Sequence, residues 1–265
     1  MSSNDNIIKI SAVIITHNEE KNIARCISSV KKIADEVIVV DSFSTDSTVP
    51  IAKSLGANVI SHEFNGYGEQ KYFAEKLTSN PWILSLDADE EISVELGKSI
   101  LLLKDKQPIW DAYKINILPN FCGKWIRHCG WYPQPKVRLW NKCKGATNNN
   151  TVHEEWLPVD KTVKIGRLRG DILHYSYPTI SDYMRKLEQY SELKARAAVS
   201  EGKHITLLKI IVGPAWRFIV DFFLRAGFLD GYYGYIVCKN SAFYTFIKYI
   251  KIWVYNRDKK RMAKT

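Results

Sequence analysis

The sequence lacks the cysteine pattern of a disulfide-bonded or zinc-binding protein. Its 265 residues include five cysteines, an odd number, and none of them belongs to a C-x-x-C pair. We therefore interpret the cysteines as reduced thiols in a cytoplasmic protein. A zinc site built from Cys122, His128, Cys129 and Cys143 is an alternative, although this spacing matches no common zinc motif.

Long apolar runs are also missing from the most aromatic part of the chain. Between residues 205 and 253 the longest stretch without Asp, Glu, Lys or Arg is eight residues. A helix that spans a membrane needs about 20 predominantly apolar residues, so no spanning helix is expected there. The polar residues 1–6 indicate that no signal peptide is present. Internal repeats and low-complexity segments are absent from the sequence as well.

The N-terminal part of the chain alternates between strand and helix patterns. Apolar runs predict strands at residues 8–16, 36–41, 58–61 and 82–86. The spacing of apolar residues predicts helices between them, at residues 20–32, 44–55 and 67–78. Strands that alternate with helices are typical of an α/β fold with a mostly parallel sheet.

The rest of the chain shows a mixed pattern and then a helical one. Short strands are expected at residues 112–118, 136–140 and 162–168, and an amphipathic helix at 179–202. We therefore predict a domain at residues 1–178 and a helical extension at residues 179–265.

Three polar clusters lie where the predicted strands end. Thr16 to Glu19 ends the first strand, Asp41 the second, and Asp87-Ala88-Asp89 the fourth. In a parallel sheet these ends share one rim, where ligands bind. Two aspartates one residue apart suit Mg²⁺ or Mn²⁺ that is shared with substrate phosphates. The alternative is a solvated acidic turn before a helix.

The C-terminal segment is both basic and aromatic. Residues 205–265 hold eleven Lys and Arg against three Asp and Glu, and 14 of the 32 aromatic residues. This composition predicts helices that lie on an anionic membrane surface, with Lys248 and Lys251 among the side chains that contact lipid. The alternative is that the aromatics pack onto the first domain or a second subunit. No nucleic-acid partner is expected, because the charges form no recognisable nucleic-acid-binding motif.

Eight motifs, in order along the chain, resemble those of family 2 glycosyltransferases of the GT-A fold. The first four are "AVIITHNEEKNIARCISSV", "DEVIVVDSFSTDST", "GYGEQKYFA" and "WILSLDADEE". The later ones are "GKWIRHCGWYPQPKVRLW", "VHEEW", "LHYSY" and "FLDGYYGYIVCKNSAFYTFIKY". The whole set is similar to bacterial lipopolysaccharide-core β-1,4-glucosyltransferases and covers residues 8–253.

The resemblance implies a binding site for a nucleotide-sugar donor, expected to be a UDP-hexose. The implied donor-binding residues are Thr16, Asn18, Glu19, Asp41, Lys71, Asp87 and Arg138. Asp89 and His174 would bind the Mg²⁺ or Mn²⁺ cofactor. Four of these residues have purely structural alternatives: Asp41 as the cap of a turn, Lys71 on a solvated helix face, Arg138 in core or loop packing, and His174 as a structural histidine.

The resemblance also implies the catalytic base and an acceptor contact. Glu154 matches the family's catalytic acidic residue and would take the proton of the acceptor hydroxyl. Glu155 would point elsewhere, and His153 is a weaker candidate. Trp131 and Tyr132 would stack on an acceptor sugar, or else serve in packing. The family's Q-x-x-R-W motif of processive synthases is absent, which argues against a polymerising enzyme.

The predicted function is inverting, metal-dependent transfer of a hexose, glucose from UDP-glucose, to a lipid-linked saccharide such as the lipopolysaccharide inner core. The protein would be peripheral on the cytoplasmic face of the inner membrane, and a homo-oligomer is left open. One alternative keeps the chemistry but changes the acceptor to capsule, another glycolipid or protein. A second is a non-catalytic nucleotide-sugar-binding module, which the presence of Asp89 and Glu154 disfavours.

Overall fold

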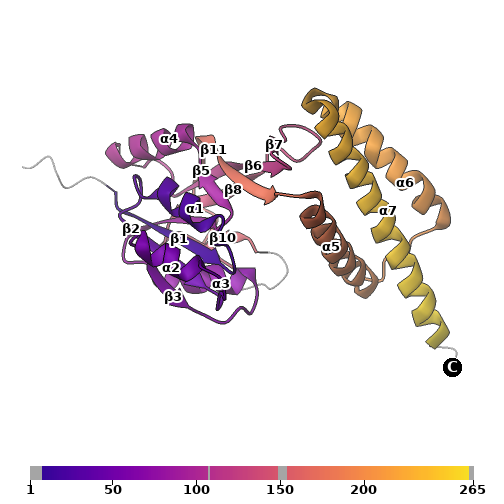
Figure 1. The fold of residues 1–265 in the computed structure, drawn as a ribbon, viewed down its shortest axis with the longest axis horizontal. Coiled ribbons are helices and arrows are strands. Elements are labelled where there is room, and N and C mark those ends of the chain that lie inside the picture. The colour runs from indigo at the N-terminus through magenta and orange to yellow at the C-terminus, as the bar shows by residue number, and fades with distance from the viewer. Residues whose placement is uncertain (1–7, 107, 149–153, 263–265) are drawn as a thin grey trace, which may run out of the picture. The chain divides into compact units, whose positions relative to one another are not determined.

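The computed structural model describes residues 8–106, 108–148 and 154–262 (Figure 1). The chain divides into two compact units. The first comprises Met1–Ile117 and Gln134–His174, and the second Leu118–Pro133 and Tyr175–Thr265. The division differs from the predicted boundary after residue 178, because the segment 118–133 belongs with the C-terminal helices.

A four-stranded parallel sheet forms the N-terminal half of the first unit. Its strands are β1 (Ile10–Thr16), β2 (Glu36–Asp41), β3 (Asn58–Ser61) and β4 (Trp82–Asp87), in the order β3-β2-β1-β4. Every residue of β1 is buried, as expected for a central strand covered on both faces. Three helices connect the strands: α1 (Ile23–Val30), α2 (Thr48–Ser54) and α3 (Tyr67–Lys76). The predicted α/β fold is thereby confirmed.

Antiparallel pairing extends this sheet beyond β4. The further strands are β8 (Pro135–Asn141), β6 (Ala112–Phe121), β11 (Ile165–Tyr177) and β5 (Glu90–Ile92), in that order, and β7 (Lys124–Trp125) pairs with β6. β5 follows β4 almost directly in the chain, yet it pairs with β11. This pairing places Glu90 opposite His174, so the turn after β4 lies beside β11.

Two further elements complete the first unit. Helix α4 (Val94–Asp105) was not predicted; it begins after Ser93, whose hydroxyl accepts a hydrogen bond from the Leu96 N–H at 3.2 Å. The strands β9 (Gly145–Thr147) and β10 (Trp156–Pro158) form a separate antiparallel pair. Since Trp156 lies opposite Thr147, this pair positions the residues just before β10.

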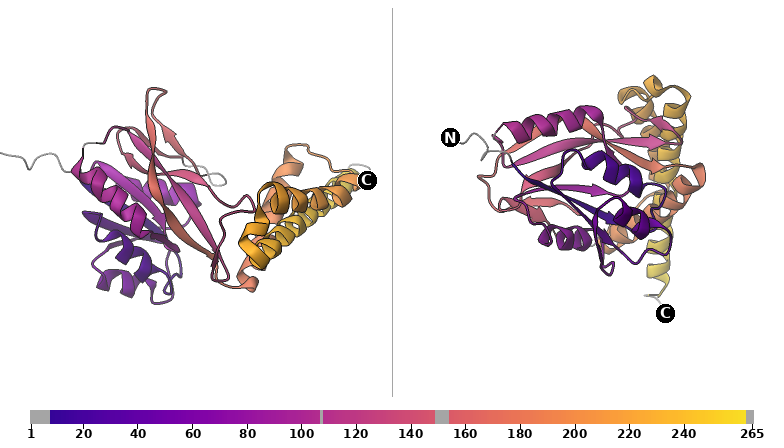
Figure 2. Two further views of the ribbon diagram at one scale, coloured as in Figure 1. Left: turned by 90° about the horizontal axis from the view of Figure 1, so that it is seen from above. Right: turned by 60° about the vertical axis from the view of Figure 1, so that its left-hand side comes forward.

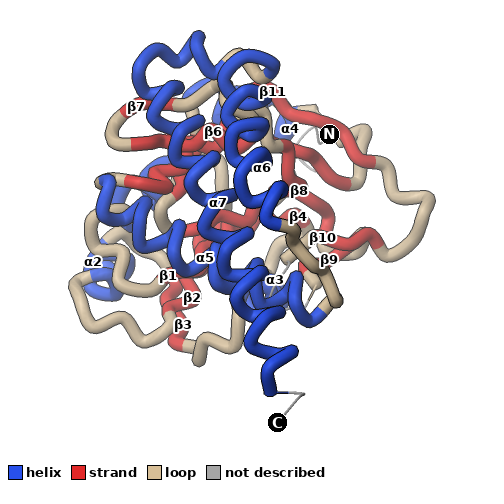
Figure 3. Tube along the Cα trace, turned by 90° about the vertical axis from the view of Figure 1, so that its right-hand side faces the viewer, coloured by secondary structure: helices blue, strands red, loops and turns tan. Residues whose placement is uncertain are grey.

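The second unit is helical, and its helices run alongside one another (Figures 2 and 3). They are α5 (Ile180–Ser200), α6 (Leu207–Ile219), the π-helical turn Val220–Leu224, the short 3₁₀ turn Gly227–Asp230 and α7 (Gly231–Met262). Asp221 is fully buried and accepts hydrogen bonds from Arg217 at 2.5 Å and Arg225 at 3.0 Å. None of the helices in the described ranges is long and apolar enough to cross a membrane.

Candidate active site

The rim of the parallel sheet brings Thr16 and Asp41 together, since they are register partners at the ends of β1 and β2. Asp41 is buried, and its carboxylate accepts hydrogen bonds from the Ser44 N–H at 2.9 Å and the Ser44 hydroxyl at 2.5 Å. The turn-capping role is therefore present in the structure. Each carboxylate oxygen keeps a further lone pair, so capping does not use up the acceptor capacity of Asp41.

Asn18 and Glu19 connect the loops that follow β1 and β2. The Asn18 side chain accepts a hydrogen bond from the Thr45 N–H at 2.8 Å, and its backbone is left-handed, with φ at 54°. The Glu19 N–H donates to the Thr48 hydroxyl at 2.8 Å. These contacts fix the two loops at the edge where the donor pocket was predicted.

Lys71 of α3 stands at the centre of a buried charge cluster. Its Nζ lies 2.8 Å from Asp87 Oδ1 and 2.8 Å from Glu154 Oε1, and its side chain is only 5% exposed. The alternative of a solvated helix face is therefore wrong. Arg138 of β8 lies 2.7 Å from Glu90 Oε1 and 3.4 Å from Asp87 Oδ2. Four predicted residues from separate parts of the sequence thus meet in one cluster.

Burial and pairing act against each other within this cluster. Burial alone would raise the pKa of Asp87, but Lys71 and Arg138 hold that pKa well below its usual range. Burial likewise disfavours the Lys71 ammonium, yet Asp87 and Glu154 raise the pKa of Lys71. For Glu90, burial is the dominant effect and raises its pKa in spite of Arg138. The cluster therefore holds Lys71, Arg138 and Asp87 in their charged forms.

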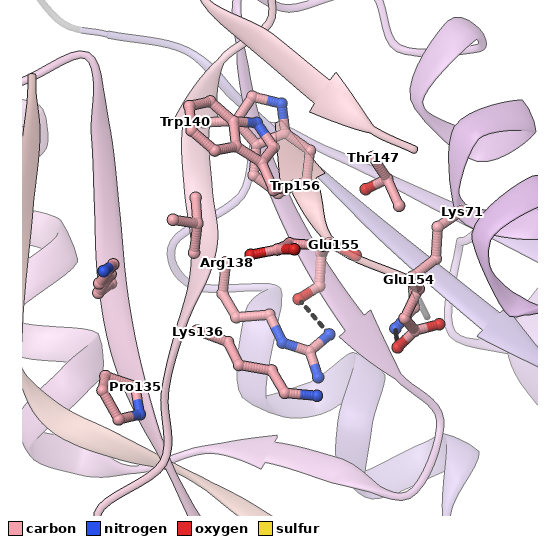
Figure 4. Close-up of a pocket in the computed structure, with 12 residues that line it drawn as sticks. Lys71, Pro135, Lys136, Arg138, Trp140, Thr147, Glu154, Glu155 and Trp156 are labelled. Carbon is pink, nitrogen blue, oxygen red and sulfur yellow. Dashed lines mark hydrogen bonds and ion pairs between the residues drawn. The ribbon is translucent and has the colours of Figure 1, made fainter. Parts of the chain in front are cut away.

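A pocket of about 420 Å³ opens beside this cluster (Figure 4). Lys71 and Glu154 are in contact on one side, and Arg138 and Lys136 extend toward them from the other (Figure 4). Its lining consists of Lys71, Ser85, Lys114, Pro135, Lys136, Val137, Arg138, Trp140, Thr147, Glu154, Glu155 and Trp156. Glu155 was expected to point elsewhere but also lines the pocket. His153 lies outside the described residues.

Glu154 uses its two oxygens differently. Oε1 is held by Lys71 at 2.8 Å. Oε2 is buried and has no hydrogen-bond partner among the described residues. A carboxylate that is anchored by one oxygen and has free lone pairs on the other can serve as a proton acceptor, and the Glu154 side chain lines the pocket.

Asp89 and His174 form a second pair at the turn after β4. His174 Nε2 lies 3.1 Å from Asp89 Oδ2, as the pairing of β11 with β5 requires. Burial would lower the pKa of His174, but the hydrogen bond and charge of Asp89 raise it. Asp87, the other aspartate of the Asp87-Ala88-Asp89 cluster, contacts Lys71 and Arg138 and not His174.

The metal-ligating groups of Asp89 and His174, one carboxylate and one imidazole, fit Mg²⁺ or Mn²⁺ bound together with a phosphate. No group of three or more His, Cys, Asp or Glu side chains that could hold a metal ion exists in the part of the chain that the structure describes. A closed zinc site, such as the cysteine alternative, needs about four protein ligands. Mg²⁺ needs only one or two carboxylates, because waters and substrate phosphates supply the rest. One carboxylate beside an imidazole meets that requirement.

Trp131 and Tyr132 belong to the second unit rather than the first. The Trp131 ring packs against Phe121, Tyr177 and Tyr183, with centroid distances of 6.1, 5.5 and 6.3 Å. The packing alternative therefore accounts for the contacts of Trp131. The Tyr132 ring lies below the guanidinium of Arg127, 5.6 Å away.

Two buried carboxylates near the cluster were missed from the sequence. Glu90 pairs with Arg138, and its Oε2 accepts a hydrogen bond from the Asp87 N–H at 2.9 Å. Glu75 of α3 accepts hydrogen bonds from the Thr147 N–H at 3.2 and 3.1 Å. The acidic run "DADEE" contains Glu90 and was a usable signal. Nothing local marks Glu75, because its partner lies on β9.

Comparisons with known proteins agree with this arrangement. The model of "Glycosyl transferase family 2" matches residues 11–187. An uncharacterized glycosyltransferase of Rickettsia typhi is 39% identical over 252 residues, which cover 92% of this chain and 86% of that protein. The lipopolysaccharide core biosynthesis glycosyltransferase LpsC of Rhizobium meliloti is 29% identical over 93% of this chain and 92% of that protein.

Proposed function

This chain belongs to glycosyltransferase family 2, and we propose that it transfers a hexose, glucose from UDP-glucose, to a lipid-linked saccharide such as the lipopolysaccharide inner core. The similarity to LpsC supports this class of acceptor. The observation that carries the proposal is the carboxylate of Glu154, a residue that lines the pocket: Lys71 holds its Oε1, and its Oε2 has no hydrogen-bond partner among the described residues.

In the proposed reaction the acceptor hydroxyl binds in this pocket. Its oxygen attacks the anomeric carbon of the donor sugar while the bond from that carbon to the diphosphate breaks. The hydroxyl proton moves to Glu154 Oε2, and the attack from the face opposite the diphosphate inverts the anomeric centre. Lys71 orients Glu154 through Oε1, so the same oxygen always faces the acceptor.

Other residues of the chain hold the donor. Thr16, Asn18, Glu19 and Asp41 border the nucleotide at the rim of the sheet. Asp89 and His174 would hold Mg²⁺ or Mn²⁺, which when bound offsets the negative charge of the departing diphosphate.

A donor screen tests this proposal. Thermal unfolding is measured with UDP-, GDP-, ADP- and CMP-sugars, each with and without Mn²⁺, and hydrolysis of the stabilising donor is then followed. We expect UDP-glucose to stabilise the protein most, in a Mn²⁺-dependent manner, and to be hydrolysed slowly without acceptor. Stabilisation without any hydrolysis or transfer would favour the non-catalytic binding module instead.

We also propose that the second unit docks on the cytoplasmic face of an anionic membrane. Twelve large apolar side chains between residues 207 and 235 are exposed. On α6 they are Leu207, Leu208, Ile211, Val212, Trp216 and Ile219, with exposures from 43% to 73%. Lys209 and Arg217 lie on the same helix. Apolar side chains together with basic ones are the requirement for a helix that lies in the membrane interface.

This surface differs from the lysine contacts expected on α7. Lys251 is 15% exposed and pairs with Glu188 at 2.7 Å and Glu192 at 3.3 Å, so it joins α7 to α5. Lys248 lies over the Tyr244 and Tyr249 rings, at 5.5 and 5.2 Å. We therefore assign the lipid contact to α6 and the turns that follow it.

Vesicle binding tests the docking proposal. Leu208→Asp combined with Ile211→Asp should abolish binding to anionic vesicles, since both side chains are more than two-thirds exposed, at 70% and 73%. The control is Leu102→Asp on α4 of the first unit. The Leu102 side chain is 59% exposed, and this variant should bind vesicles as the unmodified protein does. Undiminished vesicle binding by the double variant would contradict the assignment of the lipid contact to α6.

A further inference from the structure

We propose that Glu75 is a positioning residue for the transfer: by holding the β9–β10 pair on α3, it keeps Glu154 within reach of Lys71. This inference rests on the proposed function, because it takes Glu154 to be the base. It adds a residue that is not among those lining the pocket and that acts on the reaction only through the base.

Glu75 is a buried carboxylate without a cation to balance it. The residue is 6% exposed, and it forms no ion pair with any residue in the described ranges. Both of its oxygens instead accept from a single backbone N–H, that of Thr147, at 3.2 and 3.1 Å. Burial raises the pKa of Glu75 in spite of this hydrogen bond and the charge of Lys71. Because burying an unpaired carboxylate costs free energy, a purely stabilising role accounts poorly for Glu75.

The Thr147 N–H lies on the outer side of the β9–β10 pair. The next N–H along the chain, that of Asn148, donates to the Glu155 carbonyl oxygen at 2.9 Å. Alternate residues of an antiparallel strand bond toward the partner strand and away from it, so the Thr147 N–H faces α3. Since Glu155 directly follows Glu154, Glu75 fixes the strand against which the base is held.

Helix α3 carries both contacts on one side. Lys71 and Glu75 are four residues apart, which places them one turn apart on the same side of a helix, and both are buried. Lys71 Nζ lies 2.8 Å from Glu154 Oε1 and 2.8 Å from Asp87 Oδ1. The helix therefore holds the base directly and, one turn further on, holds the strand beside it. Loss of the second contact would let the segment of the base move, while Asp87 at the end of β4 stays in place.

Steady-state transfer by three variants tests the inference. Glu75→Met removes the acceptor, and Glu75→Asp keeps the charge on a side chain that is shorter by one methylene. Both should lower kcat by about tenfold to 10², with the KM of UDP-glucose nearly unchanged. Glu75→Gln keeps an oxygen that accepts from the Thr147 N–H and should stay within about threefold of the unmodified enzyme. An active Glu75→Asp beside an impaired Glu75→Gln would assign the effect to charge and would overturn positioning.

The same substitution in an enzyme without its base separates positioning from folding. In a Glu154→Gln background, Glu75→Met should lower the residual kcat by less than about threefold, because residues that act as a unit are not additive. A merely structural role would lower kcat by the same factor in both backgrounds, and that result would contradict the inference.

A matched control removes a similar contact far from the base. Glu36, the first residue of β2, accepts a hydrogen bond from the Ser79 N–H at 3.0 Å, at the opposite end of that strand from Asp41. Glu36→Met should leave kcat per folded molecule unchanged, with the folded fraction taken from urea denaturation.

Hydrogen exchange followed by mass spectrometry measures the contact without relying on transfer. Peptides that cover β9 and β10 should exchange faster in Glu75→Met, by about tenfold or more, because local opening becomes easier. Glu75→Gln and Glu36→Met should leave these peptides unchanged. Unchanged exchange in Glu75→Met, or faster exchange with normal kcat, would overturn the inference. Failure of the proposed function is recognised separately, as the absence of UDP-glucose hydrolysis and transfer by the unmodified protein.

Discussion

Replacing Lys71 by Met should destabilise the first unit strongly, because it removes the cation on which two carboxylates depend. Lys71 Nζ lies 2.8 Å from both Asp87 Oδ1 and Glu154 Oε1. Methionine keeps much of the side-chain length but leaves the two carboxylates without this partner. Removing one member of a buried ion pair costs about 3–5 kcal/mol.

Three features of the cluster determine how much stability the Lys71→Met variant should lose. The Asp87 and Glu154 side chains are 29% and 24% exposed, so water can partly solvate them. Asp87 also retains Arg138, 3.4 Å away. We therefore expect a loss of about 3 kcal/mol in the free energy of unfolding, at the lower end of the range for buried pairs.

The loss should also depend on pH in a defined way. Asp87 has a lowered pKa, so its pairing stabilises the protein above the unfolded value of about 3.9 and is lost as pH falls through the lower folded value. Lys71 has a raised pKa, so its contribution is present below about pH 10.4 and is lost as pH rises through the higher folded value. The difference between the two proteins should be constant from about pH 5 to 9 and should shrink in stronger acid.

Urea denaturation followed by tryptophan fluorescence measures this difference. The control is Lys76→Met, since Lys76 lies on the same helix, is exposed and packs over the Tyr72 ring at 4.1 Å. Such a surface change should alter the free energy of unfolding by about 0.5 kcal/mol or less. Equal losses for Lys71→Met and Lys76→Met would refute the reasoning about the cluster.

Asp89→Asn should remove the Mn²⁺-dependent part of UDP binding, because a divalent cation needs the carboxylate charge; calorimetry with Mn²⁺ and with EDTA measures this, and unchanged Mn²⁺ dependence contradicts the metal assignment. Glu192→Gln should destabilise the second unit at neutral pH but not in acid. Hydrogen bonds from Tyr255 and Arg196 lower the pKa of Glu192 to about 2. The contribution of Glu192 to stability is therefore present above about pH 4.3 and is lost toward pH 2. Urea titrations that show the same stability difference between variant and unmodified protein at pH 7 and at pH 3 would count against this prediction. Asp221→Asn should cost about 2 kcal/mol, because a neutral amide accepts the hydrogen bonds from Arg217 and Arg225 more weakly than the buried carboxylate does; a loss below about 0.5 kcal/mol would argue that this carboxylate does not hold the two arginines.

The parallel half of the sheet could be predicted because its strands are continuous apolar runs. The expected strand at residues 58–61 matches β3, and the strand ending at Asp41 matches β2. Since the carboxyl ends of parallel strands share a rim, the sequence also predicted that Thr16, Asp41 and Asp87 would lie at one edge. Local pattern and sheet geometry are sufficient for these features.

Other elements escaped prediction for physical reasons. Helix α4 exposes Val94, Leu101 and Leu102, which obscures its amphipathic pattern. Strand β5 is three residues long and exists only through its pairing with β11. Such pairing joins residues far apart in the chain, so no local signal marks it.

The same reason limits prediction of the site. The family resemblance selected Lys71 and Glu154 separately, but their ion pair joins residues 83 positions apart. The sequence therefore could not show that Lys71 anchors one oxygen of Glu154 and leaves the other without a partner.

The central claim is that Glu154 is the base of a glycosyl transfer, and the kinetics of Glu154→Gln test it most directly. Glutamine keeps the size of the side chain but cannot accept the acceptor proton. Transfer from UDP-glucose and binding of UDP-glucose are measured for this variant beside Glu155→Gln, its neighbour on the same pocket. We predict that Glu154→Gln lowers kcat by about 10²–10⁴ with nearly unchanged donor affinity, while Glu155→Gln stays within about tenfold of the unmodified enzyme. Normal turnover by Glu154→Gln, or a loss that lies in donor binding, would contradict the claim.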